Sequence, residues 1–310
     1  MAGVTARDRR FWLAGRDVDL PMTTRVVERN ESKDGCVKLA IGLADGNVVE
    51  TVVLPSPRGV SVCLSSQVGC AVGCRFCASG QAGLTRNLTT EEIVEQLVAA
   101  RRENPGVDRL VVMGIGEPMM NAENLLAALE VIRVEGKIGP RRMVVSTVGA
   151  RGAIRRLATW GRRVSLALSL HAPDDELRAE LIPSLAGTSI AELVEDATWY
   201  AGHTRTRVLA EYTLLAGVND SDDHARRMGE RLKGRPIYLN VIPYNAVAGA
   251  PFERPDAARA RRFMVLVRES GAFSTVRETM GATEVAACGQ LRARRLIDAT
   301  SSSGPASADS

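Results

Sequence analysis

Residues 70–77 read Cys-Ala-Val-Gly-Cys-Arg-Phe-Cys, and this stretch decides how the rest of the chain is interpreted. The chain has six cysteines, and clustered cysteines in a reducing compartment usually mark a metal centre or a catalyst. Structural zinc needs a fourth protein ligand, and the nearest histidine is His171. A four-iron cluster held by three cysteines leaves one iron open to an external molecule. We therefore interpret Cys70, Cys74 and Cys77 as iron–sulfur ligands, with zinc or inert core cysteines as the alternatives.

Short apolar strands alternate with longer amphipathic helices from residue 60 onward, after a hairpin with strands at 37–43 and 48–54. The helix near residue 90 has the clearest start, because Thr89 and Glu92 are spaced as a capping box. The alternation predicts a parallel sheet covered by helices, either doubly wound or a partial barrel. The expected strands are 60–64, 109–113, 143–146, 164–170, 207–214 and 237–242, and the expected helices are 90–102, 121–134, 150–160, 174–181, 189–202, 221–233 and 256–270.

Composition excludes two broad classes of protein. The 310 residues are 45% hydrophobic and 25% charged, which is typical of a folded globular chain and not of whole-chain disorder. No window approaches about 18 uninterrupted apolar residues, so we expect no membrane span. The start lacks the apolar region of a signal peptide, so we expect a cytoplasmic protein. Of the 40 basic residues only four are lysine, and arginine suits phosphate contacts.

Polar residues stand where the expected strands end. In a β/α barrel the carboxyl ends of the strands form the catalytic face, and the three cysteines follow the first strand. Taken singly, each of these residues is an ordinary turn or cap; together they predict a site. The candidates are Gly116 and Glu117 after the second strand, Ser146 at the end of the third, Ser169, Leu170 and His171 at the end of the fourth, and Asn245 after the sixth.

The chain resembles the radical S-adenosylmethionine (SAM) superfamily in its C-x3-C-x2-C loop and in Phe76. More narrowly, it resembles the RlmN/Cfr family of radical SAM RNA methyltransferases over about residues 35–295. The motifs that carry this resemblance are Leu64-Ser65-Ser66-Gln67-Val68-Gly69-Cys70, Gly83-Leu84-Thr85-Arg86-Asn87-Leu88-Thr89, Met113-Gly114-Ile115-Gly116-Glu117-Pro118, Ser169-Leu170-His171-Ala172-Pro173, Gly217-Val218-Asn219-Asp220 and Ala286-Ala287-Cys288-Gly289-Gln290-Leu291.

The resemblance implies a fold and a cofactor set. The fold is a partial (β/α)6 TIM-like barrel, with residues 1–55 as a short extension that carries the hairpin, 56–297 as the radical SAM core and 298–310 as a disordered tail. Cys70, Cys74 and Cys77 would hold one [4Fe-4S] cluster. The residues that would contact SAM are Gly116, Glu117, Ser146, Ser169, Leu170, His171 and Asn245.

The resemblance also implies roles for two distant cysteines. One SAM would methylate Cys288, and a second would generate the radical that activates this methyl group for addition to adenine. Cys63 would then attack the Cys288 sulfur and release the product, leaving a transient disulfide. Glu50 corresponds to the proposed proton acceptor. Cys36 matches no motif, and we interpret it as structural.

The implied substrate is adenine in RNA, methylated at C2 or, alternatively, at C8. We expect 23S rRNA and possibly tRNA as targets, a one-electron reductant such as flavodoxin as a partner, and a monomer. The residues before the hairpin leave little room for the family's helical accessory domain. Phosphate contacts would then fall to Arg141-Arg142, Arg155-Arg156, Arg162-Arg163, Arg226-Arg227 and Arg261-Arg262. The alternatives are radical methylation of a small molecule or peptide, and a non-enzymatic, metal-stabilised RNA-binding module.

Overall fold

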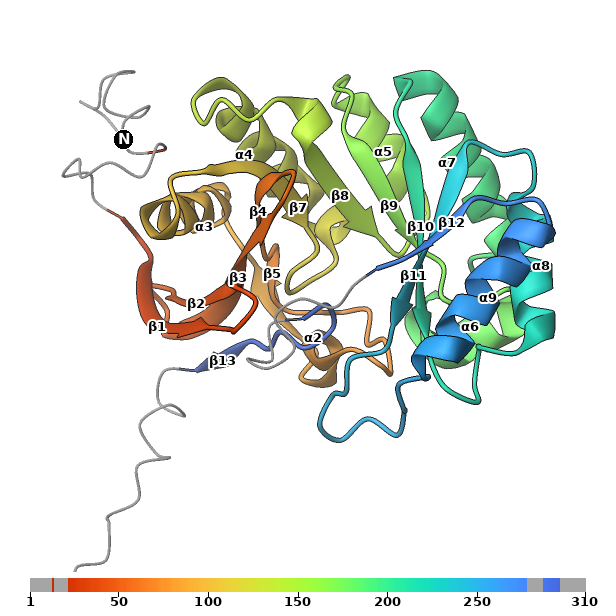
Figure 1. The fold of residues 1–310 in the computed structure, drawn as a ribbon. Helices are drawn as coiled ribbons and strands as arrows, with labels where there is room; N and C mark the ends of the chain where they lie inside the picture. Colours follow the sequence, from red (N-terminus) through yellow and green to blue (C-terminus); the bar gives the residue numbers. More distant parts are fainter. Residues whose placement is uncertain (1–12, 14–21, 278–286, 296–310) are drawn as a thin grey trace, which may run out of the picture.

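One eleven-stranded mixed sheet forms the frame of the molecule (Figure 1). The computed structural model describes residue 13, residues 22–277 and residues 287–295. The strand order is β1-β2-β3-β4-β7-β8-β9-β10-β11-β12, and β13 (Arg294–Arg295) pairs with β3. The sheet bends into an arc with helices along its outer side, so one concave side is left for a site.

The barrel half of the sheet is parallel throughout. All six strands expected from the sequence are present, which confirms the expected α/β architecture of a partial barrel. A seventh parallel strand, β12, extends the arc, and three residues are too few for periodicity to reveal. The parallel strands are β4 (Gly59–Cys63), β7 (Val107–Val112), β8 (Met143–Thr147), β9 (Ser165–Ser169), β10 (Val208–Leu214), β11 (Ile237–Pro243) and β12 (Ser274–Val276).

The seven expected helices are all present, with ends within three residues of the expected positions. The capping box of the first is confirmed: Thr89 Oγ1 accepts from the Glu92 N–H at 3.2 Å, and the Glu92 carboxylate accepts from the Thr89 N–H at 2.9 Å. Apolar stripes bury these helices against the sheet. They are α3 (Thr90–Glu103), α4 (Ala122–Val134), α5 (Ala153–Thr159), α6 (Asp175–Leu181), α7 (Ile190–Thr204), α8 (Asp222–Leu232) and α9 (Ala257–Glu269).

The hairpin continues the same sheet. Strands β2 (Val37–Gly42) and β3 (Asn47–Ser56) are antiparallel, and β3 pairs in turn with β4 of the barrel. The hairpin and the barrel share one hydrophobic core. The expected boundary between residues 55 and 56 falls at the end of β3. The expected tail at 298–310 lies outside the described residues.

Besides β12 and the two-residue β13, three further strands were not expected from the sequence. Strand β1 (Arg25–Glu31) pairs with β2, and its side chains are mostly exposed, so it carries no apolar pattern. Strands β5 (Gln67–Gly69) and β6 (Leu84–Asn87) form a small separate ribbon around the cysteine loop. No helix among the described residues is long and apolar enough to cross a membrane.

Candidate active site

The cysteine loop, residues 70–77, is anchored at both sides. At its start the Cys70 N–H donates to the Gly83 carbonyl at 2.9 Å, which ties the loop to the β5–β6 ribbon. On the other side the Arg75 N–H donates to the Leu181 carbonyl at 3.1 Å, and Ser184 Oγ donates to the Val72 carbonyl at 2.6 Å. The loop is therefore held between the ribbon and the end of α6.

The three cysteines of this loop line one cavity of about 150 Å³, which we call the cysteine-loop cavity. Burial raises the pKa of the Cys74 thiol well above its usual value, and the thiolates of Cys77 and Cys70 raise it further. Three thiols this close together ionise together only beside a positive centre.

The same donors do not form a single-ion site. Among the described residues, no three His, Cys, Asp or Glu side chains converge on the position of one metal ion. In a four-iron cluster each cysteine binds a different iron, so the sulfurs stand farther apart than around zinc. The donor set therefore fits a [4Fe-4S] cluster better than a zinc ion.

Most of the expected SAM contacts line this cavity together. The exception is Leu170, which is fully buried and absent from the lining, and whose N–H donates to the Glu211 carbonyl at 3.0 Å. The expected residues that do line the cavity are Gly116, Glu117, Ser146, Ser169, His171 and Asn245.

Glu117 is a buried carboxylate fixed by backbone donors. Its Oε1 accepts from the Met119 N–H at 3.1 Å and its Oε2 from the Val148 N–H at 2.9 Å. Gly116 before it has a φ of 108°, and a Cβ there would lie 2.6 Å from Gln67 Cβ, so only glycine fits. Burial raises the pKa of Glu117. A carboxylate in such a dry site favours a cationic partner, such as the ammonium group of an amino acid.

His171 presents a neutral imidazole to the cavity. Its Nδ1 accepts a hydrogen bond from the Thr213 N–H at 2.9 Å, so the proton of the neutral ring is on Nε2. Burial and the charge of Arg178 lower the His171 pKa to about 3. Phe76 packs edge-on against the ring at 4.8 Å between centroids. His171 is therefore a fixed hydrogen-bond donor at neutral pH.

Two other residues that were expected to contact SAM form hydrogen bonds within the wall of the cysteine-loop cavity. Ser146 Oγ donates to the Val112 carbonyl at 2.8 Å and so joins the ends of β8 and β7. Asn245 Nδ2 donates to the Cys288 carbonyl at 3.2 Å, and its Oδ1 accepts from Arg254 at 2.9 Å. Asn245 thus positions the segment that carries Cys288.

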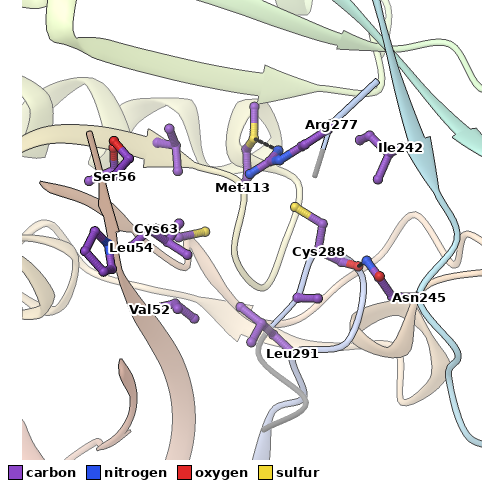
Figure 2. Close-up of a pocket in the computed structure, with 14 residues that line it drawn as sticks. Val52, Leu54, Ser56, Cys63, Met113, Ile242, Asn245, Arg277, Cys288 and Leu291 are labelled. Atoms are coloured by element: carbon purple, nitrogen blue, oxygen red, sulfur yellow. Dashed lines mark hydrogen bonds between the residues drawn. The ribbon is translucent and has the colours of Figure 1, made fainter. Parts of the chain in front are cut away.

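A second cavity, of about 180 Å³, adjoins the first. We call it the hairpin cavity because Val52 and Leu54 of β3 line it, and Figure 2 shows Cys63 and Cys288 pointing into it from opposite sides. Both cysteines are free thiols. The residues that line both cavities are Met113, Ile242, Asn245, Arg277 and Cys288.

Cys63 is the more deeply buried of the pair. It pairs with Val52 across β3 and β4, which sets its side chain on the cavity side of the sheet. Burial raises the pKa of the Cys63 thiol to about 12, while the charge of Arg277 acts in the opposite direction. A base or a cation must therefore assist before this thiol can act as a nucleophile.

Glu50 does not line the hairpin cavity, although it is near residues that do. It is on the same face of β3 as Val52 and Leu54. Its carboxylate is buried, lies 3.3 Å from Lys38 Nζ, and accepts from the Arg292 N–H at 2.8 Å. Glu50 therefore also ties the C-terminal segment to the hairpin.

Sequence reasoning missed two charged residues of the site. Arg277 follows β12, and its guanidinium reaches over the hairpin cavity toward the Met113 sulfur (Figure 2). Glu211 lines the cysteine-loop cavity; its Oε2 accepts from Asn240 at 2.7 Å, and its Oε1 has no partner among the described residues. An acidic residue inside the apolar strand Val208–Leu214 was the signal for Glu211, whereas nothing in the sequence singled out Arg277.

The arginine pairs expected to contact RNA are largely engaged within the protein. Arg155 pairs with Asp196 at 2.8 Å and stacks on Trp199, and Arg227 pairs with Asp174 at 3.0 Å. Arg162 lies 3.3 Å from Glu130. These ion pairs are on exposed surfaces, so they leave the guanidinium groups accessible to solvent.

Comparison with known proteins agrees with this geometry. The radical SAM superfamily profile matches residues 64–228. A relative from Gloeobacter violaceus, named a probable dual-specificity RNA methyltransferase RlmN, is 47% identical over 276 residues, which is 88% of this chain and 79% of the relative. A relative of the same name from Rhodopirellula baltica is 46% identical over 86% of this chain and 73% of its own length.

A solved structure shows the same architecture. The crystal structure of a radical SAM methyltransferase from Sphaerobacter thermophilus superposes with a TM-score of 0.84 at 42% sequence identity. The match covers 87% of this chain and 82% of the other. Spore photoproduct lyase, at 12% identity and a TM-score of 0.50, shares the fold alone.

Proposed function

The chain belongs to the radical SAM superfamily and, within it, to the RlmN family of RNA methyltransferases, and from this premise we propose that it methylates C2 of adenine through a methyl group carried on Cys288. Its enzyme class is that of a SAM-dependent radical RNA methyltransferase. We propose 23S rRNA and tRNA as its substrates, in the cytoplasm, and the dual-specificity name of its relatives supports two RNA targets.

One observation carries the proposal: Cys63 and Cys288 line one cavity, and Cys288 also lines the cavity that holds the three cluster cysteines. A thiol that adjoins both cavities can receive a methyl group on one side and deliver it on the other.

We assign the cofactors to the cysteine-loop cavity. Cys70, Cys74 and Cys77 hold one [4Fe-4S] cluster, and the Glu117 carboxylate takes the ammonium group of SAM. Gly116, Ser146, Ser169, His171 and Asn245 complete the contacts, with Leu170 contributing through its backbone. When bound, the cluster and SAM supply an electron and a 5′-deoxyadenosyl radical.

The protein's own steps follow from the two thiols. Cys288 would take a methyl group from one SAM, and this methyl group would give up a hydrogen atom to the radical that a second SAM would supply. The activated carbon would bond to the adenine ring carbon, the ring would give one electron back to the cluster, and Glu50 would accept the proton that the ring loses. The Cys63 thiolate would then attack the Cys288 sulfur; the carbon–sulfur bond breaks, a disulfide forms, and the released carbon takes up a proton to become the methyl group of the product. A thiol reductant then reduces the disulfide and restores both cysteines. In this proposal the enzyme is a monomer, and a flavodoxin-type protein supplies it with single electrons.

The test maps methylated adenosine by mass spectrometry of nucleosides after anaerobic reaction with rRNA or tRNA. We expect 2-methyladenosine in RNA and about four irons per chain. Methylation at C8 would favour the alternative target atom. Cleavage of SAM without any methylated RNA would favour a small-molecule or peptide substrate, and bound zinc without SAM cleavage would favour an RNA-binding module.

A further inference from the structure

Arg178 is a buried cation that forms no ion pair with a carboxylate of the described residues. Its side chain is the largest of the fully buried ones in the described part of the chain, with 1% of its surface exposed. Its Nη2 donates to the Val148 carbonyl at 2.7 Å and to the Ser169 carbonyl at 3.4 Å. Its Nε has no hydrogen-bond partner, and no acidic group lies within ion-pair distance among the residues described. A guanidinium in such a place needs a negative charge nearby, because desolvating an unpaired ion is costly.

The helix that carries Arg178 packs against the cysteine loop. Leu177 and Leu181 of α6 lie in one apolar cluster with the three loop cysteines. The Leu181 carbonyl accepts from the Arg75 N–H. Burial lowers the pKa of Arg178, and Cys74 and then Asp175 are the groups that oppose this shift. The packing of α6 therefore brings Arg178 close to the loop that would hold the cluster.

Arg178 does not line the cysteine-loop cavity, so it is not among the SAM contacts. It lies outside the cavity wall, because the two carbonyls that it contacts belong to Val148 and Ser169, which do line the cavity. A cation in the cavity would compete with Glu117 for the cofactor, whereas a cation outside the wall can act on the cluster, as it does on His171, without occupying the cofactor site.

We propose that Arg178 is the fixed counter-charge of the iron–sulfur cluster and raises its reduction potential. The inference rests on the cluster of the proposed function. A cluster with three thiolate ligands gains a further negative charge when it is reduced, and a cation held nearby in a dry setting stabilises that reduced state. Nε, which lacks a partner, is the donor available for a hydrogen bond to sulfur, and such bonds also raise the potential.

The competing explanation is purely structural. The two carbonyls that Arg178 contacts belong to Ser169, at the end of β9, and Val148, just beyond β8, so the guanidinium could merely clamp these ends together. Both explanations predict that loss of Arg178 destabilises the fold. Only the counter-charge role predicts a change in the potential of a cluster that is still correctly assembled.

The experiment measures the midpoint potential of the full-length protein, reconstituted anaerobically and without SAM, by titration followed with EPR. We expect Arg178→Gln to make reduction at least tenfold less favourable, which is a shift of 59 mV to lower potential for one electron. We expect Arg178→Lys, which keeps the charge, to stay closer to the native potential.

Arg101 offers a matched control. It is also a buried arginine, without an ion pair in the described part of the molecule, and it donates to the carbonyls of Val107 at 3.1 Å and Leu13 at 2.7 Å. It lies on α3, outside the cluster loop. Arg101→Gln should lower the melting temperature but leave the potential unchanged.

An Arg178→Gln protein with full iron content and the native potential would overturn the inference, and so would a Lys variant shifted as far as the Gln variant. If the Gln variant does not load iron, Arg178→Met takes its place, since methionine has a similar length and brings no polar group of its own into the buried site. A native protein that never assembles a redox-active cluster would instead refute the proposed function.

Discussion

Cys63 and Cys288 point toward each other across one cavity, although one ends β4 and the other lies beyond β12, more than 200 residues later in the chain (Figure 2). The cavity is bounded on the hairpin side by Val52 and Leu54 and on the barrel side by Met113 and Ile242. The two thiols are thus presented to one substrate.

Replacing Cys63 with alanine should trap the enzyme on its substrate. Without this thiol nothing displaces the methylated base from the Cys288 sulfur, so RNA should stay covalently bound. Denaturing gels and mass spectrometry after ribonuclease digestion would detect the conjugate. Cys36→Ala is the matched control, because Cys36 is also a buried free cysteine but lines neither cavity, and that variant should release its product. Recovery of RNA-free Cys63→Ala protein with an intact cluster would count against the assigned role.

The Cys63 thiol should react slowly with alkylating agents in the resting protein. Burial raises its pKa to about 12 from the ordinary value of 9.0, so it stays protonated at pH 8. Because the thiolate is the reactive form, its labelling by iodoacetamide should be about a thousandfold slower than that of an ordinary thiol. Quantitative peptide mass spectrometry, in the presence and absence of urea, compares the same residue folded and unfolded. Equal rates in the two states would contradict the assigned burial effect.

Glu117→Gln should weaken SAM binding by about 10- to 100-fold, or about 1.4–2.8 kcal/mol. The glutamine amide is neutral, and its own N–H group would face one of the two backbone N–H groups that now donate to the carboxylate. Titration calorimetry on the reconstituted protein would measure the change. Glu95→Gln is the control, because Glu95 is also a buried carboxylate that accepts from a backbone N–H, that of Thr24, outside the cavity. An equal loss in both variants would point to general destabilisation.

Glu50 has two possible roles that a pair of variants separates. If Glu50 is the proton acceptor, Glu50→Gln should reduce RNA methylation about 10²- to 10⁴-fold, while SAM cleavage continues. If Glu50 acts only as the ion-pair partner of Lys38, then Lys38→Met should reduce RNA methylation as much as Glu50→Gln does, because it removes the cation and leaves the carboxylate. We expect a large methylation defect only in Glu50→Gln. Similar rates for the two variants would assign Glu50 to structure alone.

Gly69 and Gly73 should respond differently to alanine, although both have positive φ, at 77° and 63°. A Cβ at Gly69 would overlap the carbonyl oxygen of Gly83, to which the cysteine loop is anchored, whereas a Cβ at Gly73 would meet open space. Gly69→Ala should therefore lose iron and melt at a lower temperature, and Gly73→Ala should show only the smaller cost of its backbone conformation. Iron analysis and thermal unfolding test this, and equal losses would contradict it.

Most of the helices and strands could be predicted from the sequence, because each of them leaves a pattern in its own residues. The capping box at Thr89 and Glu92 predicted the start of α3, and apolar runs predicted the six barrel strands. Strand β1 escaped prediction because its side chains are mostly exposed, and β12 because it is only three residues long. Both strands are stabilised by pairing with a neighbour rather than by their own pattern.

The sequence by itself determined the cysteine loop, its place after the first barrel strand, and the polar residues at the strand ends, because each of these follows from the local order of residues along the chain. Only the tertiary structure decided which other residues surround this site. It removed Leu170 from the cavity wall, set Glu50 beside Lys38, and added Glu211 and Arg277. It also buried Arg178, on a helix that packs against the cysteine loop. These relations depend on which side chains from distant segments of the chain are buried around the same cavity. That cavity exists only once the sheet has curved and the C-terminal segment has closed over it.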